Sequence, residues 1–145
     1  MKKAILSLAA ALLLASVLNI NQSAAQSLKL PAASSKQVVT QDLGISQITL
    51  TYARPNVSGR QIFGGLEQYG KVWRTGANGA TTLSFSGDVI INGKTLPAGT
   101  YGLFTVPDKN EWTVILNKNS DQWGAYEYNQ SDDVLRFTVK PEKTA

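Results

Sequence analysis

Short stretches of alternating hydrophobic and polar residues dominate the chain from residue 47 onward. Ile48, Leu50 and Tyr52 alternate with polar residues, which is the two-residue period of a β-strand with one buried face. Further strands are predicted over residues 81–85, 89–96 (a hairpin), 101–106, 112–117, 123–128 and 134–139. No helical pattern outside the signal segment reaches ten residues. The pattern therefore predicts an all-β fold, a single antiparallel β-sandwich or barrel-like domain of about seven to eight strands.

One turn is specified by its residues alone. Asn92 and Gly93 stand between two apolar runs, and this pair is the strongest short-range hairpin signal because both central residues of the turn must accept a positive φ. Turn residues also occupy positions 97–99 and 107–110. These turns are expected to separate the later strands of the domain.

Residues 54–79 interrupt the strand pattern. They contain one proline and six glycines, Pro55, Gly59, Gly64, Gly65, Gly70, Gly76 and Gly79. Such a segment is predicted to be mostly loop, with one turn of helix near residues 66–68. Binding and catalytic residues concentrate on loops that a rigid sheet carries.

The first 25 residues predict a secretory signal peptide. Lys2 and Lys3 give a basic start, residues 4–18 are apolar, and residues 23–25 supply the small-residue pattern that precedes cleavage after Ala25. The apolar run is shorter than the roughly 20 residues that a membrane-spanning helix needs. We therefore expect an exported protein, periplasmic or secreted, without a membrane span. Residues 26–37 are expected to form a flexible leader, 38–141 the β domain and 142–145 a tail.

Composition excludes several kinds of chemistry. The chain has no Cys and no His, so it cannot form a disulfide, a Ser-His-Asp triad, a thiolate nucleophile or a Cys-type zinc site. No cofactor or metal is expected. The formal charge of +4 falls by two when Lys2 and Lys3 leave with the signal peptide. That balance is too even for a nucleic-acid binder, which should carry a basic face.

A cluster of arginines is the main candidate for a binding site. Three of the four arginines of the chain fall within residues 54–74, on the glycine-rich loop and among aromatic and amide side chains. The candidate ligand-binding residues are Arg54, Arg60, Arg74, Trp73, Asn78 and Tyr69. Arginine presents a planar fork of donors that grips a carboxylate, phosphate or sulfate in a bidentate manner. The cluster predicts a site for a small anionic ligand or an acidic partner surface.

A structural role for these arginines is the competing interpretation. Each could satisfy loop carbonyls or pair with Glu67, Asp88 or Glu111, and Trp73 could simply close the end of the core.

The other aromatic residues also allow either a structural or a binding role. Trp112 lies in phase with apolar neighbours and is expected in the core, whereas Trp123, Tyr126 and Tyr128 could either pack internally or stack on sugar rings.

An enzyme of this composition would depend on carboxylates. Cleavage of a glycosidic bond uses two of them, about 5 to 10 Å apart. The available residues are Glu67, Asp88, Glu111, Asp121 and Glu127, and nothing in their spacing shows that two converge. A non-catalytic binding module is therefore preferred, and a carboxylate-dependent hydrolase acting on envelope glycans is the alternative.

Several motifs resemble one known family. They lie at residues 52–60, 62–64, 70–78, 96–101, 103–105, 111–112 and 123–126. Together they resemble the bacterial exported domain-of-unknown-function family numbered 2911, over about residues 38 to 140, with 72–78 as the most specific part. The resemblance implies a compact β domain, export and no established activity. An acidic residue often follows Gly-Ala-Asn in that family, but here the position is Gly79, so no role for that carboxylate carries over.

Overall fold

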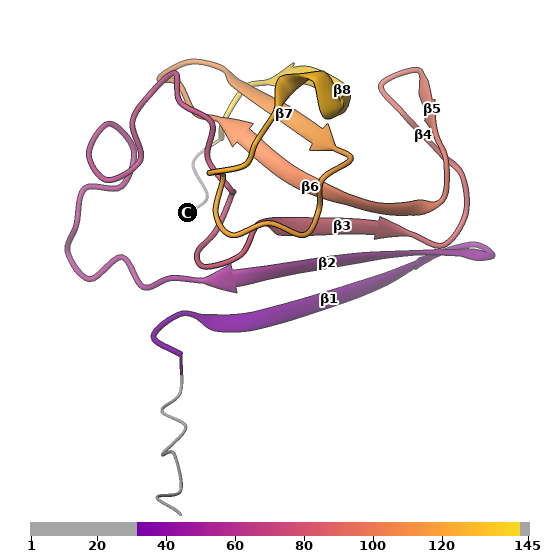
Figure 1. The fold of residues 1–145 in the computed structure, drawn as a ribbon, viewed down its shortest axis with the longest axis horizontal. Helices are drawn as coiled ribbons and strands as arrows, with labels where there is room; N and C mark the ends of the chain where they lie inside the picture. Colours follow the sequence, from indigo (N-terminus) through magenta and orange to yellow (C-terminus); the bar gives the residue numbers. More distant parts are fainter. Residues whose placement is uncertain (1–31, 143–145) are drawn as a thin grey trace, which may run out of the picture. The chain divides into compact units, whose positions relative to one another are not determined.

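Six antiparallel strands form one sheet in the order β1-β2-β3-β6-β7-β8, and β4 pairs with β5 in a separate hairpin (Figure 1). The computed structural model describes residues 32–142. Its strands are β1 (Ser35–Leu43), β2 (Ser46–Arg54), β3 (Thr81–Phe85), β4 (Val89–Ile91), β5 (Lys94–Leu96), β6 (Gly99–Val106), β7 (Trp112–Asn117) and β8 (Asp133–Val139). A short 3-10 helix, η1 (Gln130–Asp132), precedes β8. The predicted all-β, antiparallel fold class is confirmed.

The main core lies on one face of the sheet. Leu83 on β3 is the pairing partner of Tyr101 on β6, and Leu103 on β6 is the partner of Leu116 on β7, so strand alternation brings these side chains to the same face. The buried cluster there consists of Phe85, Leu96, Tyr101, Leu116 and Leu135. Since Leu96 belongs to β5, the β4–β5 hairpin packs against this face and closes the core at one end.

The opposite face of the sheet is buried by a different part of the chain. Phe104 and Ile115, which are paired neighbours on β6 and β7, are both 0% exposed. The ring of Phe104 packs edge-on against that of Tyr128 at a centroid distance of 5.2 Å. Residues 118–132, between β7 and β8, lie in front of the sheet in Figure 1. This segment covers the second face, so the central strands are buried on both sides.

The turn expected at Asn92 and Gly93 is confirmed. Both residues have positive φ, 51° and 78° respectively, and they join β4 to β5 in a tight antiparallel hairpin. The strands expected over residues 81–85 and 112–117 are also present with those bounds.

The first strand, β1, was not predicted. It begins at Ser35, inside the segment expected as a leader, and pairs with β2 along its whole length. Because β1 is an edge strand and nearly all of its residues are exposed, it has no alternation of buried and exposed positions to reveal it. Its pairing depends on backbone hydrogen bonds, which sequence pattern does not record.

Two other expectations were wrong. Residues 123–128 do not form a strand, since only Trp123 makes an isolated bridge, to Gly79, and the chain then turns. Residues 66–68 do not form a helical turn either. There the Glu67 N–H donates to the Ile62 carbonyl at 2.8 Å and Gly64 donates to the Glu67 carbonyl at 2.8 Å, which closes a tight non-helical loop.

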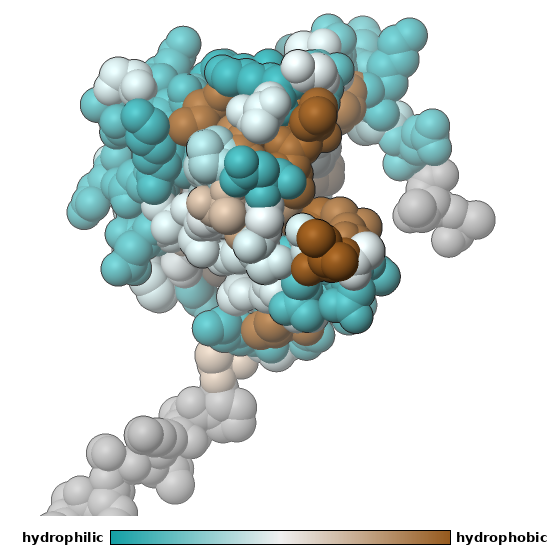
Figure 2. Space-filling model, turned by 90° about the vertical axis from the view of Figure 1, so that its right-hand side faces the viewer, coloured by the Kyte–Doolittle hydropathy of each residue, from teal (hydrophilic) through white to brown (hydrophobic). Residues whose placement is uncertain are grey.

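Some apolar side chains remain on the surface. Figure 2 faces the end of the molecule that carries the β1–β2 turn and the β4–β5 hairpin, where brown apolar groups lie among pale and teal ones. Ile45 and Ile90, from these two elements, are both exposed. Among residues 32–142, no helix is long and apolar enough to cross a membrane. The predicted signal peptide, residues 1–25, lies outside the described part of the chain.

Replacing Phe104 with alanine tests the second core face. Because Phe104 is fully buried, Phe104→Ala should lower the free energy of unfolding by about 3–5 kcal/mol, measured by urea denaturation. The matched truncation Val38→Ala, at a residue 59% exposed, should change it by less than about 1 kcal/mol. A small effect of Phe104→Ala, equal to that of Val38→Ala, would show that residues 118–132 do not pack on the sheet.

Candidate functional site

The long segment between β2 and β3 is fastened to the sheet by a two-way backbone bridge. The Trp73 N–H donates to the Thr105 carbonyl at 2.7 Å, and the Thr105 N–H donates to the Trp73 carbonyl at 3.0 Å. The Trp73 ring also packs edge-on against Phe63 and Trp112, with centroid distances of 5.6 and 6.3 Å. Trp112, which was expected in the core, is half-buried and packs in this aromatic cluster beside Phe63 and Trp73.

Threonine hydroxyls hold the turn that follows Trp73. Thr75 has a positive φ of 55°, a conformation that costs energy for a β-branched residue. Its hydroxyl lies 3.1 Å from that of Thr105, and the Thr81 hydroxyl donates to the Thr75 carbonyl at 2.9 Å. The Trp73 indole N–H donates to the Gly76 carbonyl at 3.2 Å. These bonds fix the backbone on both sides of Arg74.

Two of the arginines border the same cavity. A cavity of about 560 Å³ is lined by Arg60, Arg74, Trp73 and Glu67, together with other residues of the loop and two residues that precede β1, Ala33 and Ser34. The Arg60 side chain donates from Nε to the Val57 carbonyl at 3.0 Å, and from Nη2 to the Asn56 carbonyl. Arg60 thus supports its own loop with one edge of the guanidinium.

Arg74 is held without an acidic partner. Its Nε donates to the Gly76 carbonyl at a long 3.4 Å. Within residues 32–142, the one ion pair joins Arg136 to Asp133, at 2.6 Å. The alternative in which the clustered arginines pair with Glu67, Asp88 or Glu111 is therefore not what the structure shows. Arg60 and Arg74 bring positive charge to the cavity that no carboxylate within 4.0 Å neutralises.

Glu67 is the carboxylate of this cavity. Burial raises the pKa of Glu67 above its ordinary value, and the positive charge of Arg74 lowers it in part. Arg74 therefore acts on Glu67 through its charge, although the two side chains do not form an ion pair. The site combines two guanidinium groups, one carboxyl group and an indole ring.

The other candidate residues lie elsewhere. Arg54 borders an apolar groove next to the cavity, Asn78 lines a second cavity, and Tyr69 lines a third depression beside Lys109. Arg60, Arg74 and Trp73 therefore line one cavity. Arg54 lines the adjacent groove, which Trp73 also borders, whereas Asn78 and Tyr69 line other depressions.

Arg136 shows what an arginine with a structural role looks like in this protein. Its Nη1 donates to Asp133 Oδ2, and the Tyr128 hydroxyl donates to the same oxygen at 2.7 Å. Burial and the neighbouring Asp133 raise the pKa of Tyr128 to about 12. Asn117 donates to the other Asp133 oxygen at 2.8 Å. This network joins β8 to β7 and to Tyr128, and it pairs the charge of the exposed Arg136 with the buried side chain of Asp133.

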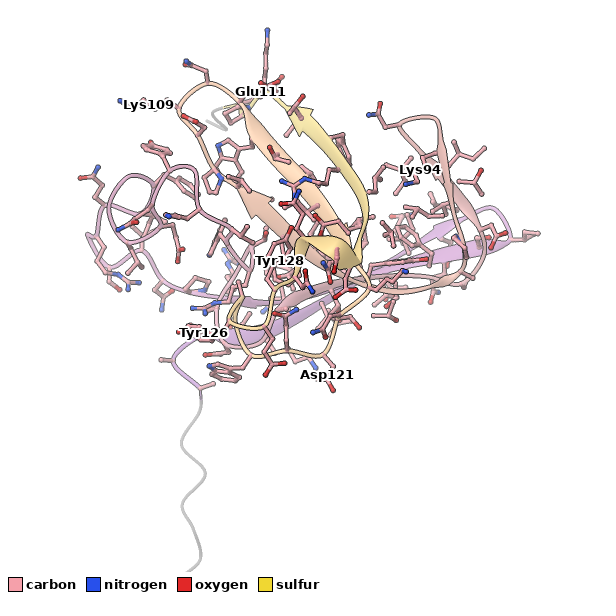
Figure 3. The ribbon with its side chains drawn as sticks, turned by 45° about the horizontal axis from the view of Figure 1, so that its top comes forward. Lys94, Lys109, Glu111, Asp121, Tyr126 and Tyr128 are labelled. Atoms are coloured by element: carbon pink, nitrogen blue, oxygen red, sulfur yellow. The ribbon has the colours of Figure 1, made fainter. Side chains whose placement is uncertain are left out.

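The carboxylates do not gather at one place. Glu67 lines the arginine cavity and Asp121 lines the second cavity. Figure 3 shows Asp121 and Tyr126 on the side of the molecule away from Glu111, which lies beside Lys109 on the β6–β7 turn. Asp88 instead accepts the Ala98 N–H at 2.9 Å and supports a turn.

Comparison with known families agrees with the sequence motifs. A family model described as a protein of unknown function (DUF2911) matches residues 34–145, and the chain belongs to this family. The resemblance drawn from the motifs is thereby confirmed. No curated protein and no solved structure matches the chain.

The charge state of Glu67 makes a testable contribution to stability. A carboxyl group whose pKa is raised on folding favours the folded state when protonated, so this contribution is present at low pH and is lost as pH rises through the folded pKa. Glu67→Gln should therefore melt at a higher temperature than the unmodified protein at pH 7. The difference should shrink at about pH 4, near the ordinary value of 4.5.

The exposed carboxylate Glu111 supplies the control for this experiment. Glu111→Gln should change the melting temperature little at either pH. A Glu67→Gln protein that melts lower at pH 7 would show instead that attraction to Arg74 outweighs the cost of burial.

Proposed function

We propose that this protein is a binding module for a small anionic ligand, held between Arg60 and Arg74. One observation carries the proposal, namely that both arginines line the same cavity while neither belongs to an ion pair within the described residues. Guanidinium groups bind carboxylate, phosphate and sulfate through paired, charge-assisted hydrogen bonds. A cavity of about 560 Å³ lies in the size range of small-molecule sites.

The rigidity of the loop supports this role. The Trp73–Thr105 bridge and the threonine bonds around Thr75 position Arg74 before any ligand arrives. A preorganised site loses less conformational entropy on binding, so more of the interaction energy appears as affinity. Trp73 adds an aromatic surface to the same cavity.

Glu67 adds selectivity to the positive cavity. Its carboxyl group accepts hydrogen bonds when ionised and donates one when protonated, and burial shifts this balance toward the protonated form. The preferred ligand therefore has an acidic group for the arginines and polar groups, such as hydroxyls, that can bond to Glu67. Since residues 1–25 predict export, we place this binding outside the cytoplasm.

The hydrolase alternative has less support. Hydrolysis of a glycosidic bond by two carboxyl groups requires a pair about 5 to 10 Å apart. Glu67 is the single carboxylate among the described residues that line the arginine cavity. We therefore retain binding without catalysis as the proposed function.

Truncation of the cavity arginines tests the proposal directly. Inorganic sulfate is the probe, titrated at constant ionic strength while the melting temperature is followed. Sulfate should stabilise the unmodified protein. Arg74→Ala should weaken binding by about 10- to 100-fold, since a hydrogen bond to a charged group is worth about 1.5–3 kcal/mol. Arg60→Ala should also weaken it.

Arg54→Ala is the matched control, because Arg54 ends β2, next to the segment, and is not among the residues that line the cavity. It should retain the response to sulfate. Circular dichroism and melting without sulfate establish that each variant folds. Equal sulfate binding by the Arg74→Ala and Arg54→Ala proteins, or the absence of any stabilisation by sulfate beyond that of chloride, would refute the proposed function.

A further inference from the structure

Two aromatic side chains near the arginine cavity face solvent. Trp123 is 65% exposed and Tyr126 is 82% exposed, both in the segment between β7 and β8. Neither ring takes part in the aromatic packing found among the described residues, which involves Trp73, Trp112 and Tyr128 instead. Large aromatic rings that are left in water on a folded surface commonly mark a binding surface.

The backbone beneath these rings is fixed. Gly124 donates its N–H to the Asn78 carbonyl at 3.0 Å, and Ala80 donates to the Gln122 carbonyl at 3.0 Å. These two bonds flank the bridge between Trp123 and Gly79. The exposed rings are therefore presented by an ordered strip of backbone that is tied to the start of β3, not by a free loop.

The exposed ring of Tyr126 and the guanidinium group of Arg74 both lie next to Gly124. A Cβ atom built on Gly124 would lie 2.9 Å from Nη1 of Arg74 and 3.0 Å from Cε2 of Tyr126. The guanidinium group and the phenol ring thus border the same glycine, which also has a positive φ of 70°. A ligand that covers the Tyr126 ring has the positive charge of Arg74 at its edge.

Hydrogen-bonding groups line the neighbouring cavity. This second cavity, of about 380 Å³, includes Asn78, Thr82, Ser120 and Gln122 in its lining. Gln122 is buried, and its Nε2 donates to the Asn119 carbonyl at 3.1 Å. Its Oε1 is also buried and has no hydrogen-bond partner among residues 32–142. Such a lining suits a ligand that carries several hydroxyl groups.

We propose that the ligand is an acidic saccharide, with a pyranose ring against Trp123 and Tyr126 and its carboxylate on Arg74. The apolar face of a sugar ring packs on an aromatic ring, while its hydroxyl groups bond to amide and hydroxyl side chains such as Asn78. This inference rests on the proposed function, because Arg74 serves both. It names the chemical class of the anionic ligand.

The surroundings of the two rings favour a saccharide over a protein partner. The centre of a protein interface is depleted of charged residues and is more apolar than the rest of the surface. Here the adjacent cavity is lined largely by amides, hydroxyls and small residues. A polyhydroxylated ligand matches that lining better than an apolar protein surface does.

Three probes, compared by calorimetric titration, distinguish the contribution of the ligand's charge to binding from that of its pyranose rings. Tetragalacturonate has both a carboxylate and pyranose rings, its methyl ester has the rings without the charge, and gluconate has the charge without a ring. Tetragalacturonate should bind the unmodified protein at least about tenfold more tightly than either control probe. Trp123→Ala and Tyr126→Ala should reduce its affinity to that of gluconate, whereas Trp123→Phe should retain most of it.

The variants also separate the two proposals. Because both rings are exposed, Trp123→Ala and Tyr126→Ala should melt like the unmodified protein and should still bind sulfate. If tetragalacturonate and gluconate bound with equal affinity, the inference that the ligand is a saccharide would be wrong, whereas the proposed anion site would stand. If the methyl ester bound as tightly as tetragalacturonate, the inference that the ligand is acidic would be wrong. Sulfate binding without binding of either galacturonate probe would assign the two rings to a protein partner instead.

Discussion

The pair of backbone hydrogen bonds between Trp73 and Thr105 is the constraint on which the site depends. The segment between β2 and β3 has no regular secondary structure to hold it, and the chain has no cysteine to form a disulfide. The bridge satisfies two backbone donors that would each cost about 1–3 kcal/mol if buried without a partner. It also places the Trp73 ring on Phe63 and Trp112, so that Arg74 follows directly from a fixed point.

The contrast between Arg136 and Arg74 distinguishes structural charge from available charge. Arg136 shares an oxygen of Asp133 with Tyr128, and its charge is paired with that carboxylate. Arg74 has only a long bond to a carbonyl and a distant carboxyl group, Glu67, whose pKa is raised by burial. Folding gains little from such an arrangement, and perturbed titratable groups of this kind concentrate at functional sites.

The sequence pattern predicted the elements that depend on interactions between neighbouring residues. Asn92 and Gly93 specify a hairpin through their backbone preferences, and the strand over residues 112–117 follows from alternation. Pattern failed for β1, which is exposed along its length, and for residues 123–128, where a glycine with a positive φ turns the chain. It grouped three arginines because they are close in sequence. Long-range contacts then placed Arg60 and Arg74 on one cavity, left Arg54 in the adjacent groove and brought the exposed Tyr126 near Arg74.

Side-chain NMR of the arginines tests the central claim most directly, since the chain has only Arg54, Arg60, Arg74 and Arg136. Their Nε–Hε signals can be followed in one titration with sulfate at constant ionic strength. The proposed site predicts saturating shifts of the Arg60 and Arg74 signals, with Arg54 and Arg136 unchanged. Equal, non-saturating shifts of all four signals would contradict it, because they would mean that sulfate meets no organised site.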